Sequence, residues 1–305
     1  MEAARASLDH ERERDPVSDV SRRAFLQMMG ITGAAALAPW PTLNAAFAHA
    51  SSTGQPAVWG RALCAVPVMD RADQLVRTVL PDEVVPLRSV SGSQAQLADG
   101  SADFACFQPV AAPPSSWTAP AAPGWAQVAA PYAVLRAWCA SDAPIVARPG
   151  WGAVFAIDDL LTVGDVTWAR LLAGDHMPQA WSPVNAWQPV TFGEPAGSPV
   201  SLIVDRRAQT IAVQPAGGRA WTAEALVSET LSTGTYPLLS RRPAENLPQP
   251  GAPWALDFGA WRAYGAYWHN SFGNARAEVP SGAIELPVLV AQALFGLPVT
   301  AAYVI

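Results

Sequence analysis

Short apolar runs separated by turn-forming residues recur along most of this 305-residue chain, and this rhythm most constrains its fold. The chain contains 29 Pro and 22 Gly. Clusters of Pro, Gly, Asp or Ser interrupt the apolar runs at intervals of about ten residues, which is typical of short strands joined by turns. Helix interiors exclude Pro, because it removes a hydrogen bond and clashes with the preceding turn. We therefore predict an all-β fold, with helical periodicity confined to the C-terminal end.

Residues 1–50 have the three parts of a secretory signal peptide. Arg22 and Arg23 precede a modestly apolar run, MMGITGAAALA, which is too short to span a bilayer. Residues 48–50, Ala-His-Ala, provide a cleavage site of small residues. The adjacent arginines indicate the twin-arginine export route. We expect the protein in the periplasm, the cell wall or the extracellular space; an amphipathic start to a cytosolic domain is the alternative.

The charge balance disfavours nucleic acid as a partner. The sequence has no Lys, and six of its 25 acidic residues and five of its 19 arginines lie in residues 1–50. The rest therefore carries 14 Arg against 19 Asp and Glu, a net charge near −5. An acidic chain without basic clusters is a poor match for a polyphosphate. After removal of the signal, no apolar stretch is long enough to span a membrane.

The sequence predicts neither a metal site nor a cofactor. Cys64, Cys106 and Cys139 show no metal-ligand spacing and no C-x-x-C motif. Beyond residue 50 the only histidines are His176 and His269. Zinc sites need three or four closely placed N or S ligands, which this set does not supply.

Two breaks rich in Pro, Ala and Ser indicate linkers, at residues 111–124 and 177–197. They divide the chain into blocks at 57–110, 125–176 and 198–305. We expect four or five short strands in each of the first two blocks, closed or half-closed into a small barrel that hides the strand edges. Both blocks resemble bacterial SH3-like domains that accompany cell-wall enzymes. The resemblance is one of pattern, with Pro-Val at a strand start and a final strand that ends in Q-P-V, as at 67–68 and 108–110. Cys64 and Cys106 fall on neighbouring strands of such a barrel. This geometry permits a disulfide, and two buried thiols are the alternative.

The third block begins with a hairpin, because Ile203, Ile211 and Val213 alternate with polar neighbours. Four more strand-like runs follow, at 223–234, 254–258, 263–268 and 281–286. A short helix is predicted over 287–296, since Pro287 suits a first helical turn and Gly296 suits a helix end.

These features resemble, in their order, the L,D-transpeptidase catalytic domain, which cross-links peptidoglycan stem peptides through a cysteine acyl-enzyme. The matching residues are Val204-Asp205 with Gln209-Thr210, Leu231–Gly234, Pro253-Trp254 with Phe258, Gly265–Gly273 and Ser281–Leu286. The most specific of them, 265–273, is similar to H-G-x-Y-W-H-N-x-F-G of one branch of the family. The resemblance implies an L,D-transpeptidase-like β-sandwich with a short C-terminal helix, preceded by the two SH3-like barrels.

The chain departs from the family at the residues that react. The nucleophilic Cys falls on Ala283, its His on Ser281 and the upstream His on Tyr264. A methyl group cannot attack a carbonyl carbon, and thiolate formation needs a nearby base. The segment before this motif is also longer, with NARAEVP in place of a shorter turn. We therefore expect no cysteine-based catalysis and a retained cleft formed by Gly265, Tyr267, Trp268, His269, Asn270 and Gly282.

Two functions of different classes follow. The first is a non-catalytic envelope protein that binds peptidoglycan or a cell-wall enzyme, the ligand being an analogy to the family. The second is an acyl-transfer enzyme that uses Ser281, with His269 as its base and Asp257 as the orienting acid. A structural spacer without a ligand is a third option, which the sequence alone does not separate from the first.

Overall fold

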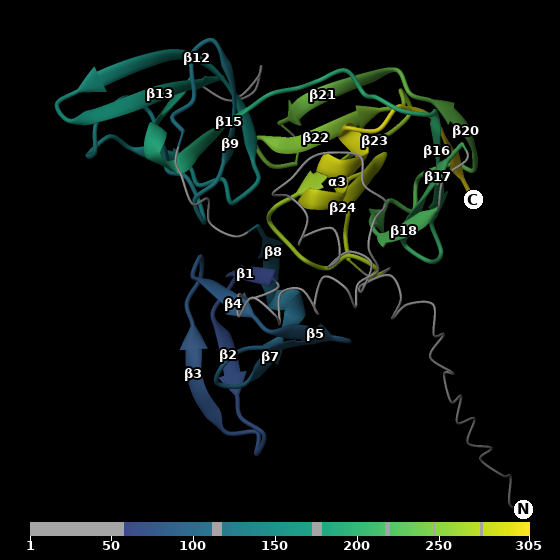
Figure 1. Cartoon of the computed structure of the whole chain (residues 1–305), viewed down its shortest axis with the longest axis horizontal. Helices are drawn as coiled ribbons and strands as arrows, with labels where there is room; N and C mark the ends of the chain where they lie inside the picture. Colours follow the sequence, from purple (N-terminus) through teal and green to yellow (C-terminus); the bar gives the residue numbers. More distant parts are fainter. Residues whose placement is uncertain (1–57, 112–117, 173–178, 217–219, 247, 275–276) are drawn as a thin grey trace, which may run out of the picture.

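The computed structural model describes residues 58–111, 118–172, 179–216, 220–246, 248–274 and 277–305. The predicted signal peptide at 1–50 lies outside these residues. The described chain is an all-β protein with one α-helix and two short 3-10 helices, as predicted. None of the described helices is long and apolar enough to cross a membrane. Figure 1 shows three successive groups of strands along the chain.

The first group consists of two antiparallel sheets. The smaller has the order β4-β1-β8 and the larger the order β3-β2-β7-β6-β5. Alternation in β2 buries Val66 and Val68, which belong to the same core cluster as Leu87 and Phe107. This group has more strands than the four or five expected. Its elements are β1 Val58–Ala62, β2 Val66–Met69, β3 Leu75–Val79, β4 Val84–Leu87, β5 Ser89–Ser91, β6 Gln94–Gln96, β7 Ser101–Asp103, η1 Phe104–Cys106 and β8 Phe107–Val110.

The cysteines match neither of the two alternatives expected for the first group, a Cys64–Cys106 disulfide or two buried thiols. All three are free thiols, so Cys64 and Cys106 form no disulfide in this structure. Cys64 is exposed rather than buried, because it lies in the bend that follows β1. Burial, and then the neighbouring Cys64 thiol, raises the pKa of Cys106 to about 11.

The second group is one seven-stranded sheet, β11-β10-β14-β13-β12-β9-β15. Its elements are β9 Gly124–Val128, β10 Leu135–Arg136, β11 Ile145–Ala147, β12 Val154–Val163, β13 Val166–Leu172, β14 Ala180–Pro183, η2 Val184–Ala186 and β15 Trp187–Val190.

The linker predicted over 177–197 is wrong for residues 180–190. This stretch forms β14 and β15, which pair with β13 and β9. Trp187 is fully buried and its indole N–H donates to Ser182 Oγ at 2.9 Å. Burial of this large ring favours the sheet, and Pro189 is tolerated because β15 is an edge strand. The division of the chain into independent domains stays a prediction.

The third group contains two five-stranded sheets whose buried side chains share one core. The first, β18-β17-β16-β25-β20, contains the predicted hairpin and a parallel pair, β16 with β25. The second, β19-β24-β23-β22-β21, contains the parallel pair β23 with β24. The strands are β16 Val200–Asp205, β17 Thr210–Pro215, β18 Trp221–Glu224, β19 Leu226–Val227, β20 Gly234–Pro237, β21 Ser240–Glu245, β22 Ala252–Asp257, β23 Arg262–Ala266, β24 Ala283–Pro287 and β25 Val299–Val304.

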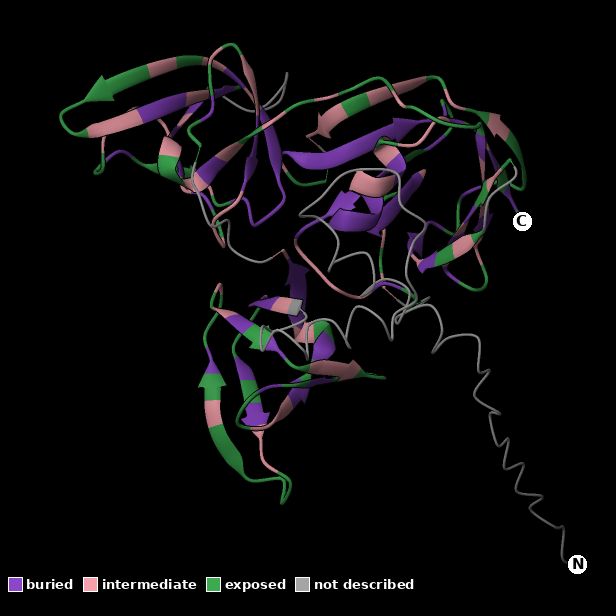
Figure 2. Cartoon of the chain, viewed as in Figure 1, coloured by how far each residue is buried: buried purple, intermediate pink, exposed green. Residues whose placement is uncertain are grey.

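The predicted helix is present as α3, Val288–Phe295, with Pro287 at its N-cap and Gly296 at its C-cap. It is not the last element, because β25 follows it and returns to the first sheet. The helix packs on β22 and β23, and most residues of the helix and of these two strands are buried (Figure 2). Gly265 permits this approach, since a Cβ at this position would lie 2.9 Å from Pro253 Cγ and 3.3 Å from Ala291 Cβ.

Candidate functional site

The parallel strands β23 and β24 bring the predicted site residues together. Their register pairs Arg262 with Ala283 and Tyr264 with Glu285. Because side chains alternate along a strand, Ala283 and Glu285 lie on the same face of β24. On its other side β24 pairs with β19, which sets Leu226 opposite Glu285.

Ala283, on which the resemblance places the nucleophile, is enclosed by apolar packing. Ala283 is only 4 % exposed and belongs to a cluster with Ala252, Ala255 and Tyr264, against which Trp268 and Val279 pack. We call these six residues the apolar wall. The rings of Tyr264 and Trp268 lie 6.4 Å apart between centroids. Burial, and then the charge and hydrogen bonding of Glu285, raises the pKa of Tyr264, so its hydroxyl stays protonated.

Ser281 belongs to a chain of hydroxyl groups rather than to a pair with histidine. Its Oγ lies 3.0 Å from Thr230 Oγ1, which lies 2.8 Å from Ser228 Oγ. The backbone N–H of Gly282 also donates to Thr230 Oγ1, at 3.1 Å. Gly282 has φ of +70°, a left-handed conformation that favours glycine at this turn.

The proposed orienting acid is also engaged elsewhere. Asp257 accepts a hydrogen bond from the backbone N–H of Gly259 at 2.8 Å and lies 3.5 Å from both Arg242 and Arg262. The described contacts therefore join Ser281, His269 and Asp257 to three different sets of partners.

His269 forms a pair with Glu285, the one charged residue buried on β24. Nε2 of His269 lies 2.7 Å from Oε2 of Glu285, and Glu285 is 2 % exposed. Nδ1 of the ring accepts a hydrogen bond from the backbone N–H of Ser271 at 3.2 Å. The ring thus faces this backbone N–H with Nδ1 and the buried carboxylate with Nε2.

A cavity of about 320 Å³ opens beside this pair. We call it the His269 pocket. It is lined by Leu226, Pro248, Trp268, His269, Ser271, Ala277, Glu278, Pro280 and Glu285. Of the six predicted cleft residues, Trp268 and His269 line it. Trp268 thus contacts both the apolar wall and the pocket.

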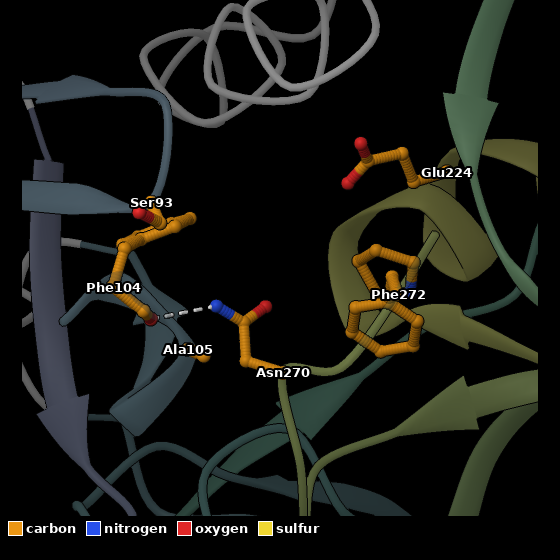
Figure 3. Close-up of a pocket in the computed structure, with 7 residues that line it drawn as sticks. Ser93, Phe104, Ala105, Glu224, Asn270 and Phe272 are labelled. Carbon is orange, nitrogen blue, oxygen red and sulfur yellow. Dashed lines mark hydrogen bonds between the residues drawn. The ribbon is translucent and has the colours of Figure 1, made fainter. Parts of the chain in front are cut away.

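A second, smaller cavity of about 60 Å³ lies between the first and third groups (Figure 3). Ser93, Phe104 and Ala105 line one side, and Glu224, Asn270, Phe272 and Pro287 complete it. Figure 3 shows Asn270 reaching across to the carbonyl oxygen of Phe104, to which its amide donates at 3.0 Å. Asn270 therefore tethers the loop after Trp268 to the first group.

Arg61 of β1 also contacts the segment that carries Trp268 and His269. This arginine is 8 % exposed, forms a salt bridge with Asp82 at 2.6 Å and donates to Gln108 Oε1 at 2.7 Å. Its Nη1 also donates to the carbonyl oxygen of Tyr267 at 3.3 Å. The Tyr267 hydroxyl donates to the carbonyl oxygen of Pro250 at 2.8 Å. The predicted cleft residue Tyr267 is therefore a buried support of the loop that carries His269.

Sequence reasoning did not single out Glu285, although a signal was present. A carboxylate between Ile284 and Leu286 is unusual in a buried strand. It stands two residues after Ala283, so it shares that residue's face. In the S-H-G-C-I-N-L motif that this segment resembles, Glu285 falls on the Asn. Within the described residues, no group of three or more His, Cys, Asp or Glu is arranged to hold a metal ion.

Comparisons with known proteins show that part of this fold is similar to solved structures. No family model and no curated protein matches the chain. Among solved structures, an L,D-transpeptidase from Mycobacterium smegmatis is 15 % identical over 48 % of this chain and 98 % of that chain, with a TM-score of 0.30. An L,D-transpeptidase from Mycobacterium tuberculosis is 14 % identical over 49 % of this chain and 77 % of that chain, with a TM-score of 0.31.

A fused Zn-dependent amidase/peptidase/peptidoglycan-binding domain-containing protein from Clostridium acetobutylicum is also similar, at 14 % identity and a TM-score of 0.27. That match covers 35 % of this chain and about half, 51 %, of the other. Because these TM-scores are low, the function proposed below rests on the residues of this chain.

Proposed function

We propose that this chain is an exported cell-envelope protein that binds peptidoglycan and does not carry out cysteine-based acyl transfer. The observation that carries the proposal is the apolar wall at position 283. The motif around it resembles that of a transpeptidase, yet its reacting position holds a buried methyl group packed against Tyr264 and Trp268. A thiol nucleophile and its base are both replaced there.

The contacts of the other polar residues favour binding over catalysis. Nucleophilic catalysis by Ser281 needs a base within about 3 Å of its hydroxyl. In this structure that hydroxyl contacts Thr230, and both ring nitrogens of His269 contact other groups. The His269 pocket remains open to a ligand beside the apolar wall. Export by the twin-arginine route and the SH3-like nature of the first two groups belong to the same proposal, as inferences from the sequence.

Acylation is the first test, because a protein with a reactive nucleophile gains the mass of a covalent adduct, whereas a protein that only binds keeps its own mass. The full chain without residues 1–50 is incubated with a carbapenem and its intact mass is measured. We expect no covalent adduct. An adduct that maps to Ser281, and that the Ser281→Ala variant lacks, would establish the alternative acyl-transfer enzyme and overturn the proposal.

Binding is the second test. The same protein is mixed with purified sacculi and sedimented, with a size-matched acidic protein as control. We expect retention above the control, reduced by soluble peptidoglycan fragments. Retention no greater than the control would overturn the peptidoglycan ligand, and co-purification with a cell-wall enzyme would then identify the other partner.

A further inference from the structure

The strand β3, Leu75–Val79, is an open edge of the larger sheet in the first group. This sheet has the order β3-β2-β7-β6-β5, so β3 pairs with β2 on one side and with no described strand on the other. Figure 1 shows β3 on the outer side of the first group, and Figure 2 shows that much of its length is exposed. An edge strand presents unpaired backbone N–H and C=O groups, which can pair with another extended chain.

This edge lacks the features that protect the other sheet edges of the described chain. Proline lies in the edge strands β4, β8, β15, β20 and β21, and β5, β11 and β19 have only two or three residues. The four-residue edge strand β18 ends in the charged Glu224. Proline, charge and short length are common ways in which an edge avoids pairing. In contrast, β3 has five residues and no proline, and its one charged residue is Arg77.

The side chains of this edge are mostly apolar and exposed. Leu75 is 60 % exposed, Val76 is 47 % exposed and Leu80, directly after the strand, is 63 % exposed. Thr78 lies between them and is exposed as well. Alternation along the strand places Val76, Thr78 and Leu80 on one face, whereas Val79 on the other face is buried in the core. The exposed face therefore offers apolar side chains beside a backbone that is free to pair.

The charge on β3 lies away from this exposed face. Arg77 is on the opposite face from Thr78, because the two residues are adjacent in a strand. Its Nε donates to Asp99 at 2.5 Å and its Nη1 lies 3.4 Å from Glu83. The residue of β2 opposite Thr78 is Pro67, which is uncharged. A second copy can therefore approach the Thr78 face of β3 without meeting a charged side chain from β3 or from this position of β2.

The sequence of this edge is complementary to itself. In two antiparallel copies related by a two-fold axis at Thr78, each Thr78 faces the partner's Thr78, and Val76 faces the partner's Leu80. In the same register Arg77 faces the partner's Val79. Cross-strand pairs of Thr with Thr, and of branched apolar residues with each other, stabilise antiparallel sheets. An axis at Arg77 would instead set two like charges opposite each other, which is unfavourable.

We propose that two copies of this chain form a symmetric dimer by antiparallel pairing of their β3 strands, with Thr78 at the two-fold axis. The pairing joins the larger sheets of the two first groups, edge to edge, into one continuous sheet. Because one short strand buries less surface than a standard interface, the dimer is weak and reversible. The inference goes beyond the proposed function, since it concerns the first group and makes no use of peptidoglycan.

The concentration dependence of the molecular mass is the first measurement. The full chain without residues 1–50 is studied by sedimentation velocity from about 1 µM to about 1 mM, the range over which weak complexes dissociate. A reductant is present, because the exposed Cys64 would otherwise permit disulfides between copies. We expect a reversible shift from monomer to dimer. A chain that stays monomeric throughout this range, or that forms larger oligomers without a dimer, overturns the inference.

An exchange of charges at the axis then assigns the dimer to β3. Thr78→Lys sets two lysines opposite each other and Thr78→Glu sets two glutamates opposite each other, so each variant alone should dimerise at least about tenfold more weakly. An equimolar mixture of the two variants pairs Lys with Glu and should recover the dimer. Thr222→Lys makes the same change at an exposed threonine of another edge strand, β18, and should associate like the parent.

Each outcome bears on one part of the inference. Thr78 is exposed, so both charged variants should unfold at urea concentrations close to that of the parent. An unchanged dimer in folded Thr78→Lys would contradict pairing through β3. Weak association of both single variants without recovery in their mixture would contradict the axis at Thr78. A dimer without retention on sacculi overturns the peptidoglycan proposal alone, whereas retention of a chain that is always monomeric overturns this inference alone.

Discussion

The apolar wall and the His269 pocket occupy the same face of β24, two residues apart, yet their chemistry is opposite. At Ala283 a small side chain is enclosed by Tyr264 and Trp268 and has no polar group. At Glu285 a buried carboxylate is hydrogen-bonded to His269 and borders an open cavity. The backbone register is common to both positions. The comparison teaches that one strand pair can enclose a methyl group at one position and hold a buried carboxylate two residues later, within a single backbone register.

Trp268 contributes to both the apolar wall and the His269 pocket. Loosening the loop that carries it should therefore disturb both regions and have the largest effect. Arg61→Met removes a buried cation and leaves Asp82 and Gln108 without their shared partner. We expect a loss of about 3 kcal/mol in the free energy of unfolding, measured by urea denaturation.

A matched arginine provides the control. Arg77 pairs with Asp99 and Glu83 at the surface of the first group. Solvent screens these pairs, so Arg77→Met should cost at most about 0.5 kcal/mol. Equal losses for Arg61→Met and Arg77→Met would show that the buried clamp does not stabilise the loop.

Glu285→Ala tests the polar member of the comparison. Removal of the carboxylate leaves Nε2 of His269 without its hydrogen-bond partner in a largely buried place. We expect destabilisation of about 2 kcal/mol by urea denaturation. The exposed Glu278→Ala should change stability by no more than about 0.5 kcal/mol. A stabilised Glu285→Ala variant would mean that burial of the charge costs more than its hydrogen bonds return.

Ala283→Cys tests the apolar member. One added sulfur atom should cost about 1 kcal/mol or less. A thiol buried among Tyr264, Trp268 and alanines is expected to stay protonated, so a carbapenem should leave its intact mass unchanged. Adding Ser281→His and Tyr264→His supplies the family's basic residues. Acylation of the triple variant alone would show that the frame still supports the chemistry, whereas acylation of the single variant would contradict the closed wall.

The smallest expected effect concerns the two buried tyrosines, Tyr264 and Tyr267. Burial is the main reason that the pKa values of Tyr264 and Tyr267 are raised. Their protonated forms therefore contribute stability that is present below the usual tyrosine pKa and is lost as pH rises above it. In an alkaline titration followed by tyrosinate absorbance, we expect both to ionise only as the protein unfolds. The Tyr264→Phe variant should lack part of this late absorbance. If it instead lacks part of the absorbance that appears near the ordinary tyrosine pKa, Tyr264 is not buried at the wall.

Local features of the sequence predicted much of the fold. Alternation at Ile203, Ile211 and Val213 predicted the hairpin, and Pro287 with Gly296 marked the helix. The prediction failed where distant residues decide pairing. The Pro-rich stretch at 180–190 has the composition of a linker, but burial of Trp187 draws it into the second sheet.

For the site, the sequence by itself predicted Ala283 at the position that resembles the nucleophile's and marked the segment 265–273, because identity and spacing along the chain are enough to recognise a motif. Only the tertiary structure decided that His269 pairs with Glu285, that Ser281 contacts Thr230, and that Arg61 and Phe104 of the first group hold the loop between. These contacts join residues up to 206 positions apart. Such pairings depend on how sheets meet in space, which no local propensity encodes.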